Sequence, residues 1–158
     1  MLVPVNISRL LIREMADSQF VTLQEIDGTR SFPIAIGLNE AFAIERRMSG
    51  AVPPRPQTHD LLESILVSLG AKLVRIEIHD LDAGTFHARL VLEHEGRSIA
   101  VDSRPSDALA LGVASDTPVF VEDSVIAEAG SMHSTDEGGS SGSSGFDEDL
   151  DEDDSEFQ

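Results

Sequence analysis

The sequence predicts an α+β domain that contains two copies of a strand–hairpin–helix motif, with mixed or antiparallel sheets packed against helices. The first observation is a repeat: residues 30–44 (RSFPIAIGLNEAFAI) align with residues 97–111 (RSIAVDSRPSDALAL) without a gap. Four positions of this alignment are identical, and five others keep their chemical type. Two copies, at about residues 8–50 and 74–115, indicate internal duplication, and they are too few for a solenoid. A connector and a helix fill residues 51–70.

The second observation is hydrophobic periodicity in the second copy. Apolar and polar residues alternate over residues 74–79 and again over 86–93, which predicts two strands. Glu95 and Gly96 are typical of a tight hairpin turn, and residues 98–101 form the returning strand. Pro105 then begins a helix, at a position where its missing N–H costs no hydrogen bond.

The remaining elements follow from turn and capping residues. In the first copy the helix ends at Ser49, because Gly50 is a typical C-terminal residue. After a proline-rich connector, Thr58 is the predicted N-cap of a helix over residues 59–69. The apolar residues of that helix form one stripe, made of Leu61, Leu62, Ile65, Leu66 and Leu69. Residues 118–121 read as a short edge strand with proline at its start, and residues 124–129 as a short helical or irregular end.

Composition separates the domain from its C-terminal segment. The net charge of the 158 residues is −18, but residues 131–158 hold ten acidic residues and no lysine or arginine. The domain, residues 1–130, therefore has a net charge of −8, which argues against broad non-specific DNA binding. The acidic segment is predicted to be disordered and solubilising, or else to bind a basic partner.

The compartment is predicted from what the sequence lacks. It has no cysteine, which favours a reducing environment. It shows no signal peptide and no apolar run long enough to span a membrane. We therefore expect a cytoplasmic protein that does not contact a membrane.

The strongest candidate site lies where the two copies differ. Residues 35–40 (AIGLNE) are nearly apolar, whereas residues 102–107 (DSRPSD) are densely polar. Asp102, Arg104 and Asp107 thus gather at a predicted helix N-terminus, which suits a phosphate or a metal–phosphate pair. The alternative is structural: Arg104 pairs with one of the aspartates, and the serines, Ser106 among them, cap the helix.

Two further candidates lie outside this junction. His59 begins a helix and is a candidate acid–base group, held by Asp60, although Asp60 and its neighbours can equally cap the helix. Asp80 is a candidate Mg²⁺ ligand or, alternatively, bonds to its own backbone. The pair Arg46–Arg47 reads as a solvated helix face.

Four motifs together resemble the bifunctional nuclease family, in the order in which that family has them. They are FPIAIG with Glu40–Ala41, PRPQTHDL at residues 54–61, IHDL at 78–81 with GTFHA at 84–88, and DSRPSDA at 102–108. They span most of residues 5–128. The resemblance implies an α+β fold with internal duplication, DNase and RNase activity, and nucleic acid as the partner.

The predicted function is therefore hydrolysis of phosphodiester bonds in single-stranded or unstructured nucleic acid. Asp102, Asp107 and Asp80 are expected to hold Mg²⁺ or Mn²⁺ and to orient water, with Asp102 and Asp107 as the metal ligands proper. Arg104 and Arg55 are expected to bind phosphate, together with Ser106, and His59 to transfer protons. The alternative is a non-enzymatic module that binds an anion or regulates, and that forms homo-oligomers.

Overall fold

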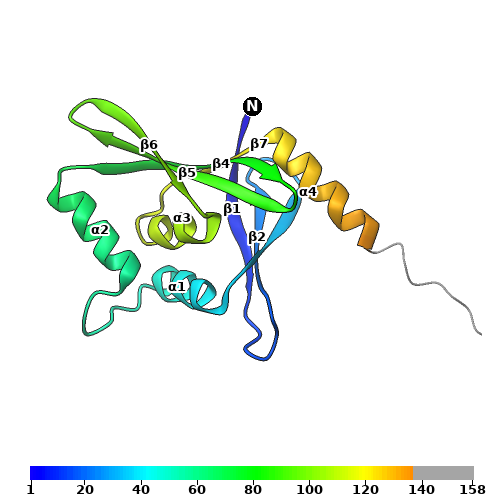
Figure 1. Cartoon of the computed structure of the whole chain (residues 1–158), viewed down its shortest axis with the longest axis horizontal. Helices are drawn as coiled ribbons and strands as arrows, with labels where there is room; N and C mark the ends of the chain where they lie inside the picture. Colours follow the sequence, from blue (N-terminus) through cyan, green and yellow to red (C-terminus); the bar gives the residue numbers. More distant parts are fainter. Residues whose placement is uncertain (137–158) are drawn as a thin grey trace, which may run out of the picture.

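The computed structural model describes residues 1–136, which form one seven-stranded sheet with helices packed against it (Figure 1). The strand order is β3-β2-β1-β7-β4-β5-β6. The first half of the sheet and its helix comprise β1 (Leu2–Leu11), β2 (Gln19–Glu25), β3 (Ser31–Ile36) and α1 (Leu38–Ser49). The second half and its helix comprise β4 (Lys72–Asp82), β5 (Thr85–His94), β6 (Arg97–Ser103) and α3 (Pro105–Gly112). The prediction of an α+β fold is confirmed.

Strand β7 (Val119–Glu122) joins the two halves of the sheet. It pairs antiparallel with β1 and parallel with β4, so it is a central strand. The prediction of an edge strand was wrong. Pro118 lies just before β7, where its missing N–H costs nothing, and its carbonyl accepts a hydrogen bond from the Ile76 amide at 2.9 Å.

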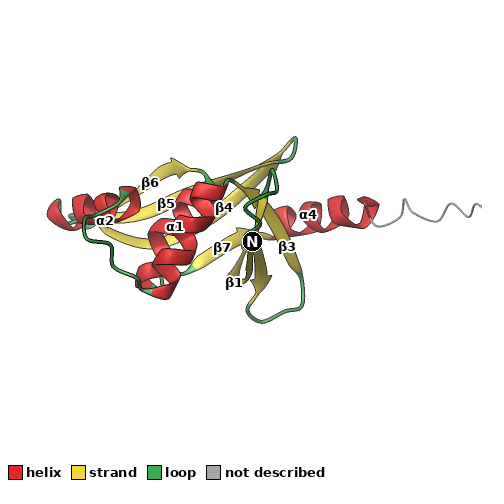
Figure 2. Ribbon diagram, turned by 90° about the horizontal axis from the view of Figure 1, so that it is seen from below, coloured by secondary structure: helices red, strands yellow, loops and turns green. Residues whose placement is uncertain are grey.

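Helices α1 and α3 lie together against one face of the sheet, whose two halves cross at a steep angle (Figures 1 and 2). Seven of the eight residues of α3 are buried, so this helix forms the centre of the core. The rings of Phe32 and Phe86, one from each half, stack with centroids 5.6 Å apart. Helix α4 (Asp123–Asp136) packs on β3, β4 and β7 through Val125, Ile126 and Ala129.

The two halves share a topology, but their hairpins differ in register. Each half is an antiparallel three-stranded meander followed by a helix. Ala35 and Asp102 occupy the same position in the repeat, but Ala35 pairs with Phe20 and Asp102 pairs with Arg89. The β5–β6 turn is also tighter, and both of its residues, Glu95 and Gly96, have positive φ angles. Descent of the two halves from one duplicated motif remains a prediction.

Local signals located most helix ends correctly. Helix α1 stops before Gly50, which has the left-handed conformation with φ 72°, and α3 begins at Pro105. Helix α2 (Thr58–Ser68) begins one residue earlier than expected: its N-cap is Gln57, whose amide donates to Asp60 at 2.9 Å. Helix α2 also has no buried residue, so its apolar stripe does not face the core.

Helix α4 continues to Asp136, beyond residues 124–129, where a short helical or irregular end was predicted. The rest of the acidic segment, residues 137–158, lies outside the described residues. None of the helices in residues 1–136 is both long and apolar enough to cross a membrane.

Candidate functional site

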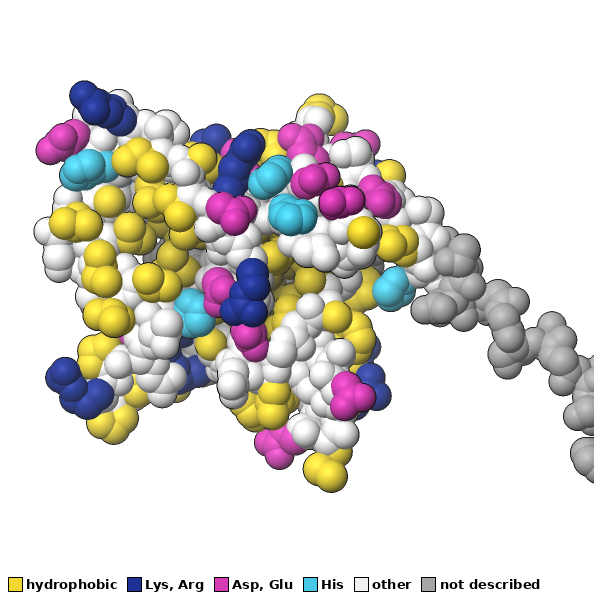
Figure 3. Space-filling model, in the orientation of Figure 1, with side chains coloured by type: hydrophobic (Ala, Val, Ile, Leu, Met, Phe, Trp, Pro, Cys, Tyr) yellow, Lys and Arg dark blue, Asp and Glu magenta, His cyan; other side chains and the backbone are white. Residues whose placement is uncertain are grey.

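A hollow of about 710 Å³ lies along α1 and is bordered by the first turns of α2 and α3. Glu40, His59, Arg104 and Asp107 line it. On this face of the molecule a basic side chain lies between acidic ones, with a histidine beside them (Figure 3). The first turns of α2 and α3 contribute residues to its wall, and a helix N-terminus favours a bound anion.

Arg104 is held by one carboxylate from each half of the domain. Its Nε donates to Asp107 Oδ2 at 2.8 Å, and its Nη1 donates to Glu40 Oε1 at 3.0 Å. Glu40 and Asp107 are the residues that the repeat aligns with each other. The Arg104 side chain nevertheless remains 64% exposed, so its other N–H groups are open to a ligand.

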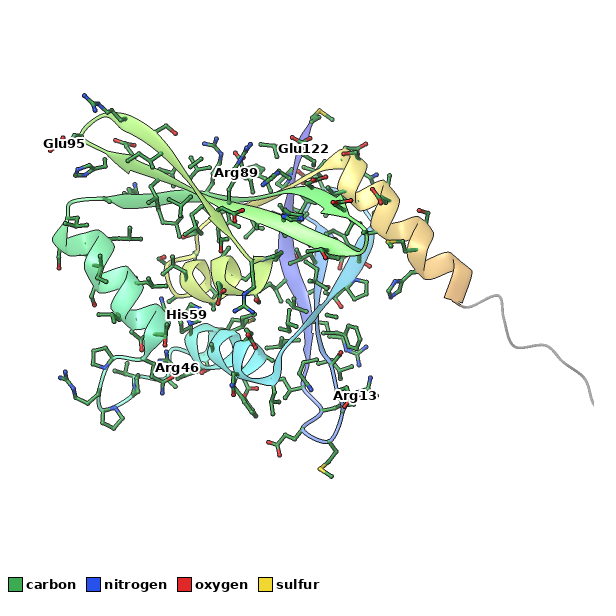
Figure 4. All side chains as sticks on the ribbon, viewed as in Figure 1. Arg13, Arg46, His59, Arg89, Glu95 and Glu122 are labelled. Atoms are coloured by element: carbon green, nitrogen blue, oxygen red, sulfur yellow. The ribbon has the colours of Figure 1, made fainter. Side chains whose placement is uncertain are left out.

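His59 lies in the first turn of α2, at the end of the helix that is near α3, and it approaches the same aspartate (Figure 4). Its Nε2 lies 3.1 Å from Asp107 Oδ1. An ionised carboxylate only accepts hydrogen bonds, so Nε2 must carry the hydrogen. The lone pair of the neutral ring is then on Nδ1, which makes no hydrogen bond within residues 1–136. In the neutral ring, Nδ1 is therefore the atom that can accept a proton.

Electrostatics keep this network charged. Burial alone would raise the pKa of Asp107, but the hydrogen bonds from Arg104 and His59 outweigh burial and hold that pKa below its ordinary value. The same bond to Asp107, and then the bond to Glu40, raise the pKa of Arg104. Asp107 is thus a carboxylate, and Arg104 a cation, at neutral pH.

Helix α2 is fixed to the body through two arginines of α1. Arg47 is 5% exposed and donates to the carbonyls of Ala110 at 2.6 Å and Leu111 at 3.2 Å. It also forms ion pairs with Asp60 and Glu63 of α2. Arg46 donates to the second oxygen of Asp60 at 2.9 Å. The interpretation of Arg46–Arg47 as a solvated face was wrong, because both side chains reach one carboxylate. Asp60 consequently holds these arginines and caps α2, and Asp107 holds His59.

Ser106 faces a second hollow, of about 770 Å³, between the β2–β3 and β4–β5 hairpins, α3 and α4. Ser106 is only 6% exposed, and Arg104 lines this hollow as well as the first one. Arg104 is therefore shared by two adjoining cavities, and an extended anionic chain that occupied both would pass over it.

The other predicted site residues lie elsewhere. Asp102 pairs with Arg89 in the sheet, on the face opposite to the one that α3 covers. Asp80 lies in β4, and its Oδ1 accepts a hydrogen bond from the Leu81 amide at 3.0 Å. Arg55 is exposed in the connector before α2 and lines neither hollow. The structure thus brings together His59, Arg104 and Asp107, with Ser106 on the adjoining wall.

The proposed metal ligands do not fit one metal ion. Asp102 and Asp107 lie on opposite sides of the sheet, and both oxygens of Asp107 already accept hydrogen bonds. Between Glu40 and Asp107, where two carboxylates would suit a cation, the guanidinium of Arg104 takes that place. No cluster of three or more histidine and acidic residues with metal-binding geometry occurs within residues 1–136.

Sequence reasoning missed Glu40 and Arg47 as parts of this region. Glu40 had a usable signal, since it aligns with Asp107 in the repeat. Arg47 had none, because its carboxylate partners and carbonyl acceptors lie 13 to 64 positions further along the chain.

Comparison with known proteins matches these features to one family. A sequence model of the bifunctional nuclease domain matches residues 21–134. Two curated relatives are the uncharacterized proteins MT1877 and Rv1829 from two strains of Mycobacterium tuberculosis, CDC 1551 / Oshkosh and ATCC 25618 / H37Rv. Each is 38% identical over 126 residues, which cover 80% of this chain and 75% of the relative.

Proposed function

Because this chain belongs to the bifunctional nuclease domain family, we propose that it hydrolyses phosphodiester bonds of nucleic acid at the hollow between α1, α2 and α3. One observation carries the proposal: Asp107 binds a histidine through one oxygen and an exposed arginine through the other. The pair offers a base and a phosphate-binding cation side by side, which phosphoryl transfer requires.

In the proposed reaction the nucleophile is water. Nδ1 of His59 accepts a proton from the water as its oxygen forms a bond to phosphorus. The bond from phosphorus to the leaving oxygen then breaks, and that oxygen takes the proton back from His59. The free N–H groups of Arg104 bind the phosphoryl oxygens, where negative charge increases in the transition state. Asp107 keeps the proton on Nε2 throughout, so Nδ1 is always the reactive atom.

The substrate is proposed to be single-stranded or unstructured DNA or RNA. The acidic domain attracts a polyanion poorly, so affinity must come from local contacts. Arg104 supplies such a contact, and the free amides of the first turns supply others. Arg55, Ser106, Asp80 and Asp102 remain predicted contributors, as does Mg²⁺ or Mn²⁺, and no step above depends on them.

The test compares substitutions inside and outside the site. His59→Gln and Asp107→Asn are matched with His87→Gln and Asp116→Asn, the same changes at positions that line neither hollow. Cleavage of fluorescent single-stranded RNA and DNA is measured. His59→Gln should lower kcat/KM by about 100-fold or more, the usual contribution of a general base. Both control variants should keep the activity of the unaltered protein.

Two controls protect the interpretation. Each variant is melted by circular dichroism, because Asp107 also interacts with the first turn of α3, and its loss can weaken the helix. All variants are purified identically, so cleavage that survives both site substitutions in folded protein comes from a contaminant or another site and refutes the proposal. Titration with EDTA tests the metal separately: loss of activity restored by Mn²⁺ would show a metal requirement.

A second candidate function is anion binding without catalysis. The exposed guanidinium of Arg104 at the N-terminus of α3 favours it, since this arrangement can bind phosphate whether or not a bond is cleaved. Inorganic phosphate or a mononucleotide should then raise Tm in the unaltered protein but not in an Arg104→Gln variant, with no turnover in either.

A further inference from the structure

Helix α2 packs against the body through its polar side, whereas most amphipathic helices pack through their apolar side. His59, Asp60 and Glu63 face the body and hold the helix through polar contacts. The apolar residues instead face outward, and their exposed fractions are 54% for Leu61, 41% for Leu62, 44% for Ile65, 71% for Val67 and 65% for Leu69. An apolar helix face of this size is usually covered by a partner.

A free strand edge borders the same surface. Strand β6 ends the sheet, and β5 is the element with which it makes extensive contact within residues 1–136. Ile99 and Val101, exposed at 41% and 39%, lie on the helix-covered face of β6. Hydrophobic side chains gather between α2 and the β5–β6 hairpin (Figure 3). The edge therefore combines unpaired backbone groups with an apolar flank, and such edges readily accept another strand.

We propose that this surface binds a second copy of the chain, with β6 pairing antiparallel to the partner's β6. The sequence of β6, RSIAVDS, is suited to pairing with itself around Ala100. In that register Ile99 lies opposite the partner's Val101, so apolar side chains meet on the helix-covered face. On the other face, Ser98 lies opposite the partner's Asp102, which is a hydroxyl–carboxylate pair.

The two-fold axis through Ala100 satisfies the requirement of a closed dimer, in which the same patch serves both subunits. Charge also permits the contact. The domain carries a net charge of −8, yet the outward apolar residues of α2 and residues 98–101 of β6 are uncharged, and the one carboxylate of β6, Asp102, lies opposite a serine and not opposite another carboxylate. The apolar stripes of both α2 helices flank the joined strands.

This dimer does not depend on the proposed nuclease activity, but it bears on the same residues. Helix α2 carries His59 at its first turn and is held to its own subunit by polar contacts. A partner that covers its apolar face would limit the motion of the helix, and hence of His59.

The first experiment measures mass in solution. Light scattering of the full chain at about 100 µM, above the micromolar dissociation constants of weak interfaces, should give twice the 17.0 kDa of one chain. Val101→Lys should raise the dissociation constant at least tenfold, whereas Met15→Lys, at a fully exposed position far from β6, should leave it unchanged. A monomeric unaltered protein would overturn the proposal, as would a Val101→Lys variant that dimerises normally.

The second experiment locates the axis and uses the absence of cysteine from the chain. Directly opposed residues of antiparallel strands have Cα atoms about 4.5–5.5 Å apart, within the range that a disulfide spans. Ala100→Cys should therefore cross-link two chains rapidly on mild oxidation. Met15→Cys serves as the control. Equal and slow cross-linking of both variants would refute pairing through β6, even if the protein is a dimer.

Discussion

Replacing Arg47 by leucine should weaken the attachment of α2 more than any other single change in that helix or its contacts. The guanidinium is almost fully buried and binds two carbonyls at the end of α3 and two carboxylates of α2. Leucine fills part of the volume but satisfies none of these four acceptors. The cost comes mainly from the carbonyls of Ala110 and Leu111, which lose the donor that Arg47 supplies.

The magnitude follows from these contacts. Each buried carbonyl left without a donor costs about 1 kcal/mol or more. Asp60 and Glu63 are 21% and 42% exposed, so water replaces part of their lost ion pairs, at about 0.5 kcal/mol each. The expected loss in the free energy of unfolding is about 3 kcal/mol. For a domain of this size that corresponds to a fall in Tm of about 10 °C.

Urea denaturation followed by circular dichroism measures this loss, with the neighbouring Arg46→Leu as the matched control. Arg46 is 17% exposed, bonds to one carboxylate and one carbonyl, and should cost about 1 kcal/mol when replaced. A loss below 1 kcal/mol for Arg47→Leu, or equal losses for both variants, would show that these contacts do not hold α2. Hydrogen exchange should locate the extra opening in α2 and the end of α3.

Gly112→Ala should lower stability by about 1–3 kcal/mol, because the new methyl group would lie 2.6 Å from Cδ1 of the fully buried Ile76. Gly130→Ala, on the exposed side of α4, should instead raise stability by about 0.5–1 kcal/mol, because the added methyl group would meet no atom within 4 Å outside the nearby backbone of its own helix. Thermal melts of the two variants should therefore shift in opposite directions. Glu77→Gln should cost about 2 kcal/mol at pH 7, because buried Glu77 accepts charged hydrogen bonds from two arginines of β4 and β5. Burial alone would raise the pKa of Glu77, but these bonds outweigh burial and lower that pKa in the folded protein. The stability that Glu77 contributes is therefore fully present above the pKa of an unfolded glutamate, about 4.3. It is lost as the pH falls through the lower pKa of the folded state. Equal acid sensitivity of the variant and the unaltered protein below that pH would contradict this assignment.

Residues whose effect is local could be predicted from the sequence. Gly50 ends a helix, Pro105 begins one, and Glu95–Gly96 closes a hairpin, because each acts through the conformation of its own backbone. The place of β7 in the centre of the sheet could not be predicted this way. Its partners are β1 and β4, which are distant in sequence, and four residues carry no signal that specifies such partners.

The orientation of α2 shows how a periodic pattern can mislead. Its apolar stripe has the spacing of a core-facing helix, and such a stripe normally packs inward. Here Arg47, buried in α1, attracts Asp60 and Glu63, so the polar side faces the body. The orientation of α2 thus depends on Arg47, a residue of another helix, and the periodicity of α2 gives no information about that residue.

The candidate site was predicted in part. Comparing the two copies singled out Arg104 and Asp107, which the structure shows in contact. The contact of His59 with Asp107 joins residues 48 positions apart and depends on how α2 docks. Asp102 lies only two positions from Arg104 in the sequence, but it belongs to β6 and pairs with Arg89, whereas Arg104 lies beyond the strand as the N-cap of α3.

The central position of β7 has a consequence for how the protein is made. As the chain leaves the ribosome, β1 to β3 and later β4 to β6 each complete a local meander, but no strand pairing joins the two meanders. Only when residues 119–122 emerge does one strand pair with both halves, and Ile76 obtains the Pro118 carbonyl as its acceptor. Until then, β1 and β4 each present an open edge. The connecting strand is therefore translated after both meanders, and nascent chains that stall before residue 119 should be the form most prone to aggregate.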